Sequence, residues 1–593
     1  MNKDNKPSIE KPWLKYYDEK FDEKDIPKKS IYQLALDSNK YNMNNIAIDL
    51  RTSINNYEQC FTMTYGEFFK QINKNAKSSS VMGIKTDEIV PMIVPNIPEA
   101  RTLTYSNSII GSTTYAISPL LPVTQLEKIL NENSIKNIFV FSALYEKYKK
   151  ALQNSNLENV VVLNEEESVG YQIQTLKKIK SELVNKRIIT WGEYLSYSNQ
   201  IKEDLEPYYK DDHTAIIVGT SGTTGTSKGV CLSDRNLNAG ALSYINGKVF
   251  EGSYLDALLP SIVYGTVMSH LQVVDGKHVY LVPELLTTNI SKALCATKAD
   301  VFAGGPVHYI NINASEEFKN NQMPKRNIYL SGGASLPSDI ESKLNGVSAG
   351  YSEDEINNDI IVRQGYALSE TGGLGTIAKR GAYTFGSVGI PMLYNTIGIF
   401  KPGTDEELGY NENGEICING PSVMQGYLNN PEETSKVLMK HSDGKTWVHT
   451  KDIGYMNEDG KVFHVDRIKN IFMRTGFNVH PTQIAEFIDT IPYIKNSAVI
   501  GFEHPEEQNV PVAFVELEPN ALDNKTKEEI IHEIDEQCYA NLEETSIPVD
   551  YIIVDSIPIN VGGKIDVEKI KKEANINFME NQKVLKKELN FNK

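Results

Sequence analysis

The stretch that decides the fold reads Val218-Gly-Thr-Ser-Gly-Thr-Thr-Gly-Thr-Ser-Lys228-Gly-Val230. Its twelve residues from 219 to 230 include four glycines, six hydroxyl side chains and a single lysine. Backbone N–H groups of a glycine-rich loop, hydroxyl donors and one cation together suit the binding of phosphate groups. The composition therefore predicts a loop that holds the phosphates of a nucleotide.

Apolar runs flank this loop on both sides. Residues 215–218 and 229–232 have the length and composition of buried strands, so the loop is expected to join two strands. A Walker loop has Gly directly before its Lys, Ser or Thr directly after it, and then a helix. Here Ser227 precedes Lys228 and Gly229 follows it. The stretch is therefore a nucleotide loop of another kind, and a flexible linker is disfavoured because linkers seldom separate two strand-like runs.

Composition limits the classes of protein to consider. With 593 residues, 40% hydrophobic and 23% charged, the chain is long enough for several packed subdomains. Its 60 basic and 77 acidic side chains give a net charge of −17, which argues against nucleic acid or an anionic membrane surface as the main partner. Five scattered cysteines without C-x-x-C spacing indicate neither a disulfide framework nor a zinc site. Without an apolar signal core or a membrane-length apolar run, we expect a cytoplasmic protein with no integral membrane association.

The order of patterns along the chain predicts an α/β protein. Strand-like runs at 138–141 and 160–163 are separated by a helical pattern, as in parallel-sheet units. Gly-punctuated runs between 386 and 429 indicate a small antiparallel β-barrel. We predict a large N-terminal domain over 1–468, with α/β sheets and this barrel, and a smaller mobile α+β C-terminal domain over 469–593.

Several motifs resemble the adenylate-forming superfamily of acyl-CoA synthetases, peptide-synthetase adenylation domains and luciferases. The loop at 220–230 resembles the family's signature loop, and Gln364-Gly-Tyr-Ala-Leu-Ser-Glu-Thr371 is similar to its Gln-Gly-Tyr-Gly-x-Thr-Glu motif. The resemblance extends from residue 11 to 570. An apolar cluster at 11–17 in a charged opening, and the segment 332–337, look most like fatty acid–CoA ligases.

The resemblance implies a site for ATP with Mg²⁺. Glu370 would hold the metal through hard carboxylate oxygen, and Ser369 would offer a hydroxyl to phosphate. Lys228, Glu370 and Lys564 would be the catalytic residues, with Lys564 carried by the C-terminal domain. The phosphate loop would contribute Thr220, Ser221, Gly222, Thr223, Thr224 and Lys228.

The same resemblance implies where the nucleoside lies. Gly333 and Ala334 would border the adenine, and the ring of Tyr366 would stack on it. Asp452 would accept hydrogen bonds from the ribose hydroxyls, and Arg467 completes the nucleotide site.

Three places depart from the family pattern, and one of them is the segment 465–470, where Arg467 is kept and Lys469 falls at the hinge position but Asp466 and Asn470 differ from the usual residues. The segment 258–265 lacks the histidine usual there and is one residue shorter, which bears on the acyl pocket. Lys451 stands where the family usually has Gly, and an ion pair with Asp466 is one way in which its charge could be offset.

Adenylation activates a carboxylic acid because the acyl-AMP carries a good leaving group. The resemblance therefore implies an ATP-dependent carboxylic acid–CoA ligase, acting on a medium- or long-chain fatty acid with coenzyme A as cosubstrate. Two alternatives stay open. The chain could be a stand-alone adenylation enzyme that loads an acyl or amino acid group onto an acyl carrier protein, or a nucleotide-binding homologue without catalysis.

Overall fold

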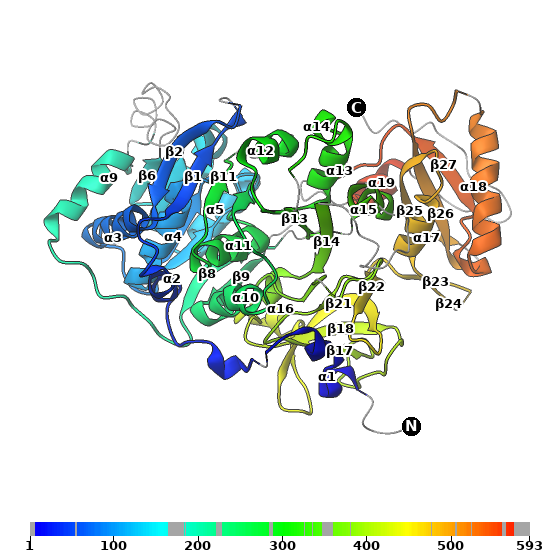
Figure 1. Cartoon of the computed structure of the whole chain (residues 1–593), viewed down its shortest axis with the longest axis horizontal. Helices are drawn as coiled ribbons and strands as arrows, with labels where there is room; N and C mark the ends of the chain where they lie inside the picture. The colour runs from blue at the N-terminus through cyan, green and yellow to red at the C-terminus, as the bar shows by residue number, and fades with distance from the viewer. Residues whose placement is uncertain are drawn as a thin grey trace.

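The computed structural model describes residues 6–19, 21–53, 56–163, 183, 185–220, 228–283, 289–324, 327–334, 336–346, 360–379, 381–475, 477–504, 507–523, 525–559 and 565–574. Figure 1 shows a large domain built around two sheets, a third sheet beneath it and a separate C-terminal domain at the right. None of the described helices is long and apolar enough to cross a membrane. The expected large α/β domain with a smaller α+β domain is confirmed.

The first sheet of the large domain has nine strands, and its central strands are parallel. The parallel β12, β13 and β14 all end on the same edge, where ligands bind in open α/β sheets. In spatial order the strands are β16 (Ile390–Pro391), β15 (Thr376–Ile377), β14 (Ile360–Tyr366), β13 (Asn327–Ser331), β12 (Val301–Gly304), β10 (Tyr254–Asp256), β11 (Val279–Leu281), β1 (Ile46–Arg51) and β2 (Gln59–Thr64).

The second sheet has eight strands and contains the predicted strand-loop-strand unit. The two apolar runs form antiparallel strands β8 and β9, paired from Thr214↔Ser233 to Gly219↔Gly229, as expected. In spatial order the strands are β19 (Gly426–Tyr427), β9 (Gly229–Ser233), β8 (Thr214–Gly219), β4 (Thr113–Ala116), β3 (Ile89–Ile93), β5 (Asn137–Phe141), β6 (Asn159–Leu163) and β7 (Arg187–Thr190).

A layer of helices lies between these two sheets. One core cluster joins apolar residues of both sheets with five helices, because each helix buries its apolar face against a sheet. These helices are α2 (Ile31–Asn39), α3 (Tyr65–Val81), α4 (Pro98–Ile110), α10 (Asp234–Asn246) and α11 (Val263–Val274). Among the described residues the domain also contains α1 (Pro7–Glu10), α5 (Val123–Glu132), α6 (Tyr145–Gln153), α9 (Trp191–Tyr197), α12 (Ile290–Thr297), α13 (Pro306–Ala314), α14 (Glu316–Lys319) and α15 (Ser338–Asn345).

The expected small β-barrel corresponds to a third, five-stranded antiparallel sheet. It comprises β17 (Thr396–Phe400), β18 (Gly414–Asn419), β21 (Thr446–Met456), β20 (Leu438–Lys440) and β22 (Val462–Arg467), with α16 (Pro431–Ser435) nearby. Two runs grouped with these strands by their glycine pattern lie elsewhere: the run 386–391 ends in β16 of the first sheet, and the run 424–429 places β19 on β9 of the second sheet. The backbone groups of β19 pair there because β9 would otherwise be an unpaired edge.

The C-terminal domain is α+β. Its elements are β23 (Phe472–Arg474), β24 (Phe477–Val479), α17 (Pro481–Ile488), β25 (Ile494–His504), β26 (Gln508–Leu517), α18 (Lys527–Asn541), β27 (Asp550–Val554) and α19 (Val567–Ala574). Strand β26 pairs antiparallel with β25 and parallel with β27. Residues 468–471 connect β22 to β23, and the boundary between 468 and 469 stays a prediction.

The N-terminal lead-in is anchored on the third sheet. Trp13, in the 3₁₀ helix η1 (Pro12–Tyr16), is 1% exposed and packs with apolar residues of β17, β18 and β22. Gly460 makes this approach possible, since a Cβ there would lie 2.5 Å from the Trp13 backbone nitrogen. The indole therefore ties the first described segment to a sheet some 400 residues later in the chain.

We predict that Trp13→Ala lowers the free energy of unfolding by about 3–5 kcal/mol, because it leaves a large cavity under the third sheet. Ile9→Ala is the matched control, since Ile9 is 68% exposed in the same lead-in and should change stability by at most about 0.5 kcal/mol. Urea unfolding followed by circular dichroism measures both. Equal effects of the two substitutions would contradict the packing described.

Candidate active site

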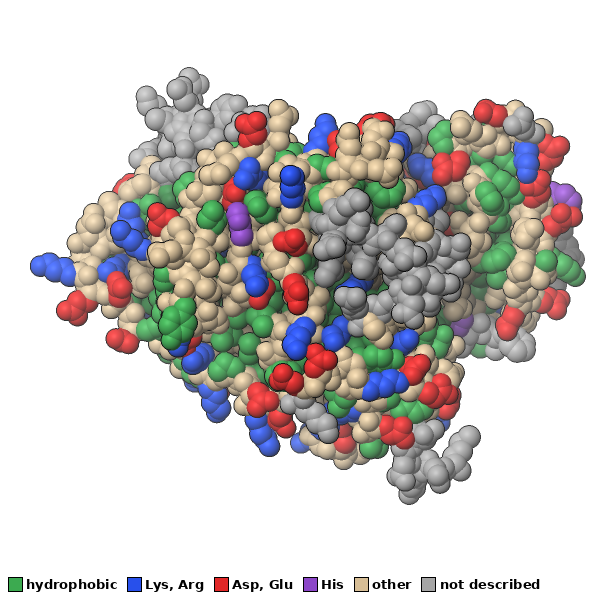
Figure 2. All heavy atoms as spheres, viewed as in Figure 1, with side chains coloured by type: hydrophobic (Ala, Val, Ile, Leu, Met, Phe, Trp, Pro, Cys, Tyr) green, Lys and Arg blue, Asp and Glu red, His purple; other side chains and the backbone are tan. Residues whose placement is uncertain are grey.

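A cavity of about 450 Å³ lies where the three sheets meet. Its walls come from the ends of β13 and β14, the base of the β8–β9 hairpin, the start of α11, and β21 with the segment after β22. Basic and acidic side chains are interspersed over the face shown in Figure 2. With a net charge of −17, the protein must therefore attract an anionic ligand through local groups in this cavity.

The turn after β13 borders the cavity. Gly333 has φ of +91°, which favours glycine, and a Cβ built on it would meet nothing within 4 Å. Gly332 before it is more confined, because a Cβ there would lie 3.3 Å from the Tyr264 ring. Ala334 follows in the same turn, outside the residues that line the cavity. The space beside Gly333 suits the close approach of a flat ligand.

Tyr366, Asp452 and Arg467 are brought together from three strands. The Tyr366 hydroxyl, at the end of β14, donates to Asp452 Oδ2 at 2.7 Å, and Arg467 Nε lies 3.0 Å from Asp452 Oδ1. Asp452 and Arg467 are opposite each other in the β21–β22 ladder. Burial raises the pKa of Asp452, but His464, Arg467 and Tyr366 outweigh it and hold the pKa below its ordinary value. Asp452 is thus an ionised carboxylate.

A second group of residues lies at the base of the phosphate loop. Thr220 N donates to Lys228 O at 2.9 Å, and Lys228 N donates to Thr220 Oγ1 at 3.2 Å, which closes the hairpin. The Tyr427 hydroxyl donates to Glu370 Oε1 at 2.6 Å, and Lys228 Nζ lies 5.1 Å from the centre of the Tyr427 ring. Tyr427 reaches this place because β19 pairs with β9.

Lys228 forms an ion pair with Glu433 of α16. This pair, and a weaker contribution from Lys436, lower the pKa of Glu433 to about 2. The local sequence around Glu433 predicts the start of a helix, since Asn430 caps it and Pro431 opens it. Nothing in that pattern indicates a partner 205 residues earlier in the chain. The sequence therefore did not identify Glu433 as a residue of the site.

The cavity gathers most of the predicted site residues that the structure describes. Asp452 lies just outside the lining and contacts Tyr366 and Arg467, which belong to it. The other predicted residues, Ser221, Gly222, Thr223, Thr224 and Lys564, lie outside the described residues. The lining also includes residues not predicted as ligands, among them Tyr244, His449 and Lys469. The predicted residues that line it are Thr220, Lys228, Gly333, Tyr366, Ser369, Glu370 and Arg467.

These residues fit ATP and Mg²⁺. Glu370 sits on the short 3₁₀ helix η7 (Ser369–Thr371) directly after β14 and its loop, and presents carboxylate oxygen at the cavity. Carboxylate oxygen is the ligand type that Mg²⁺ prefers, and the metal binds in such sites together with substrate phosphates. Glu370 would hold the ion, and the ion would supply positive charge to those phosphates.

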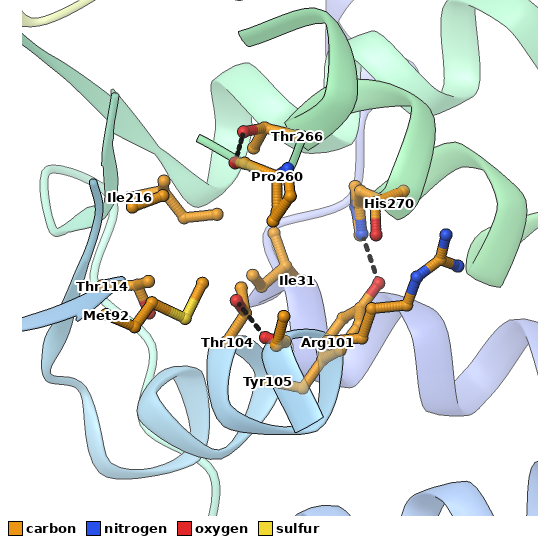
Figure 3. Close-up of a pocket in the computed structure, with 13 residues that line it drawn as sticks. Ile31, Met92, Arg101, Thr104, Tyr105, Thr114, Ile216, Pro260, Thr266 and His270 are labelled. Carbon is orange, nitrogen blue, oxygen red and sulfur yellow. Dashed lines mark hydrogen bonds between the residues drawn. The ribbon is translucent and has the colours of Figure 1, made fainter. Parts of the chain in front are cut away.

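A much smaller cavity, of about 30 Å³, lies in the core (Figure 3). His270 borders it, with Nδ1 2.9 Å from the Tyr105 hydroxyl and Nε2 2.9 Å from Asn238 Oδ1. Burial lowers the pKa of His270 to about 3, so the imidazole is neutral. This space accommodates about one water molecule. The contacts of His270 with Tyr105 and Asn238 have a structural role, because they join α11 to α4 and α10.

Glu415, Cys417 and His449 form another buried group, with possible ligand atoms within 4.8 Å of one another. The Glu415 carboxylate already accepts hydrogen bonds from His449 Nδ1 at 2.8 Å, Lys451 N at 2.9 Å and Gly403 N at 3.0 Å. His449 Nε2 is 2.8 Å from His441 Nε2. Glu415 and His449 thus form a hydrogen-bonded brace that joins β18 to β21 next to Asp452.

Comparison with known proteins decides the family. The family model of the AMP-binding enzyme matches residues 39–428, and that of the AMP-binding enzyme C-terminal domain matches residues 483–564. The chain belongs to the AMP-binding enzyme family. As a member it is an AMP-forming acid–thiol ligase, and the resemblance inferred from its motifs is confirmed.

Relatives of this AMP-binding enzyme are CoA ligases. A probable 4-coumarate–CoA ligase 1 of Dictyostelium discoideum is 28% identical over 87% of this chain and 90% of the relative. A long-chain-fatty-acid–CoA ligase of Bacillus subtilis is 26% identical over 96% of this chain and 99% of the relative. In fold, the enzyme is similar to ATP-bound MatB from Rhodopseudomonas palustris, with a TM-score of 0.73 at 21% identity, covering 92% of this chain and 98% of that one.

We predict that Glu415→Gln lowers the free energy of unfolding by about 2 kcal/mol at pH 7, because the brace loses charged hydrogen bonds. Glu412→Gln, an exposed carboxylate that accepts from Gly409 N in the loop before β18, is the control.

The pH dependence gives a second readout of this variant. Burial raises the pKa of Glu415, but the hydrogen bonds from His449 and Gly403 outweigh it and leave the pKa below its ordinary value. Such a group stabilises the fold above its unfolded pKa of about 4.3 and stops doing so as pH falls through the folded value. The stability difference between wild type and Glu415→Gln should therefore be constant above about pH 5 and shrink below about pH 4. A difference that grows on acidification would refute the brace.

Proposed function

We propose that the enzyme is an ATP-dependent carboxylic acid–CoA ligase that activates a medium- or long-chain fatty acid. The observation that carries the proposal is the mixed lining of the cavity. Lys228, Glu370 and Arg467 contribute charged groups to this lining. Helix α10, the start of α11 and β13 contribute apolar and aromatic residues, none of them charged, namely Tyr244, Ile262, Val263, Tyr264 and Leu330.

An apolar pocket of this kind suits an uncharged acyl body. An amino acid would bring an ammonium group into it, and this group would be left without a carboxylate partner. The similarity to the Bacillus subtilis long-chain-fatty-acid–CoA ligase supports a fatty acid, because it extends over 96% of this chain.

The reaction follows from the groups in the cavity. The carboxylate oxygen of the acid forms a bond to the α-phosphorus of ATP, and the bond to pyrophosphate breaks, which gives acyl-AMP. The CoA thiol then gives up its proton to solvent, its sulfur forms a bond to the acyl carbon, and AMP leaves. Lys228, the Ser369 hydroxyl and Lys564 are proposed to stabilise the negative charge around the α-phosphate. Asp452, ionised and held between Tyr366 and Arg467, would orient the ribose.

An aromatic acid is the second candidate, since Tyr244 and Tyr264 line the cavity and several similar proteins are named as probable 4-coumarate–CoA ligases. A panel of saturated acids with 6 to 16 carbons, 4-coumarate, benzoate and amino acids tests the proposal by ATP-dependent pyrophosphate release. We expect the highest kcat/KM with a fatty acid of eight carbons or more. A higher kcat/KM with 4-coumarate would overturn the choice of substrate but not the class of reaction.

The acceptor is tested on the same panel. Adding CoA, or in parallel a phosphopantetheinylated carrier protein, should produce thioester with CoA at the higher rate. Thioester formed only on the carrier would make the enzyme a stand-alone adenylation enzyme. Absence of pyrophosphate release with every acid would instead favour a non-catalytic homologue.

We predict that Lys564→Ala slows adenylate formation by about 100-fold or more, because a charge that stabilises the transition state is lost. Thioester formation from supplied acyl-AMP should largely persist, since the lysine is proposed to act only in the first step. Lys571→Ala, an exposed lysine of α19 in the same domain, is the control. Pyrophosphate exchange and thioester formation are measured separately. Equal loss of both half-reactions would exclude this role.

A further inference from the structure

Lys451 has an unusual backbone conformation for a residue with a side chain. Its φ is +60°, in the left-handed region that favours glycine. Two hydrogen bonds hold the peptide there: Lys451 N donates to Glu415 Oε1 at 2.9 Å, and Ile468 N donates to Lys451 O at 2.9 Å. Glycine would adopt this conformation without strain. A lysine at such a strained position beside a ligand cavity is therefore a reason to look for a function of its side chain.

The position of Lys451 indicates what that function is. It lines the cavity together with Thr450, Arg467 and Lys469, and its side chain is exposed. It directly precedes Asp452, whose carboxylate bonds to Tyr366 and Arg467. The ammonium group of Lys451 can thus meet a ligand that binds in the cavity beside Asp452 and Arg467.

Two other cations that line the cavity are paired with carboxylates. Lys228 pairs with Glu433, and Arg467 pairs with Asp452. Within the part of the chain that the structure describes, Lys451 has no ion pair.

Asp466, which the sequence suggested as a partner of Lys451, is used elsewhere. Its Oδ1 accepts from Arg467 N at 2.7 Å and Asn470 Nδ2 at 3.0 Å, and its Oδ2 accepts from Thr482 N at 2.9 Å. The suggested pair is therefore replaced by contacts that fasten the segment after β22 to the start of α17.

We propose that Lys451 binds a phosphate oxyanion of the nucleotide in the cavity. A cation that is exposed and unpaired gains a charge-assisted hydrogen bond to phosphate with little desolvation cost. In a protein of net charge −17, such a local cation also offsets the unfavourable field that an anionic ligand meets. The inference rests on the proposed function, because it takes ATP as the ligand. CoA also carries phosphates, so the test separates the two sources.

Substitutions of Lys451 separate the charge from the backbone strain. Lys451→Met removes the charge and keeps the strain, Lys451→Gly removes both, and Lys451→Arg keeps both. Lys298 provides a matched control. It is an exposed lysine with φ of +54° at the C-terminal cap of α12, and it lies outside the cavity lining. Lys298→Met and Lys298→Gly change the same charge and the same kind of backbone position.

The dissociation constants of ATP, AMP and adenosine are measured by calorimetry on each variant. We expect Lys451→Met and Lys451→Gly to weaken ATP by about 10-fold, with Lys451→Arg within about 3-fold of wild type and adenosine unchanged. The loss should diminish at high salt, because salt screens an exposed charge. Lys451→Gly should have a Tm equal to or above that of wild type, which shows that weaker binding does not arise from unfolding. Both Lys298 variants should bind ATP as wild type does.

Three results would overturn the proposal. ATP binding could be the same in Lys451→Met and Lys298→Met, which would leave the charge without a role. Adenosine could weaken as much as ATP, which would place the effect on the nucleoside. A rise only in the KM for CoA, measured with supplied acyl-AMP, would assign the lysine to the phosphates of CoA. If wild type itself failed to bind ATP, the proposed function would fail first, and this inference with it.

Discussion

The buried carboxylate of Asp452 is the interaction on which the site depends. Only 1% of Asp452 is exposed, and a charge in such a place is stable only when other groups bind it. Its partners come from different parts of the fold: Tyr366 from β14 of the first sheet and Arg467 from β22 of the third. The carboxylate therefore couples the ligand-binding edge of the large sheet to the sheet that leads into the C-terminal domain.

The elements around Asp452 support its position. Glu415 holds the backbone at Lys451, and the Thr450 hydroxyl donates to Ile416 O at 2.6 Å while accepting from Asp452 N at 3.1 Å. Register shifts in the ladders of β21 with β18 and with β22 mark an irregularity of the strand near this segment. Asp466 continues the arrangement by binding the segment after β22 and the first turn of α17. Any movement of the C-terminal domain about residues 468–471 must act against these contacts.

The wall of the cavity formed by β9 and β19 places its cation, Lys228, beside carboxylates. The pairing of β19 with β9 brings Tyr427 over Lys228 and against Glu370. The Lys228 ammonium group forms an ion pair with Glu433, so an anionic ligand would have to compete with this carboxylate for it. On the Asp452 side, Lys451 meets no such competitor among the described residues. Lys228 and Lys451 therefore differ in how readily they can bind phosphate.

Sequence alone determined the features that depend on local pattern. The strands at each side of the glycine-rich loop follow from apolar runs that have the length of strands and are too short for helices. The positions of Gly333, Tyr366, Ser369, Glu370 and Arg467 follow from motifs in which neighbouring residues share one task, and all five line the cavity. Tertiary structure alone decided the contacts between residues far apart in the chain. Glu433 pairs with Lys228, which lies 205 residues away in the sequence. Strand β19 pairs with the second sheet rather than the third, and Asp466 binds the start of α17 rather than Lys451. The sequence does not fix these contacts, because ion pairs and strand edges are satisfied by the partners that the packed sheets bring within reach.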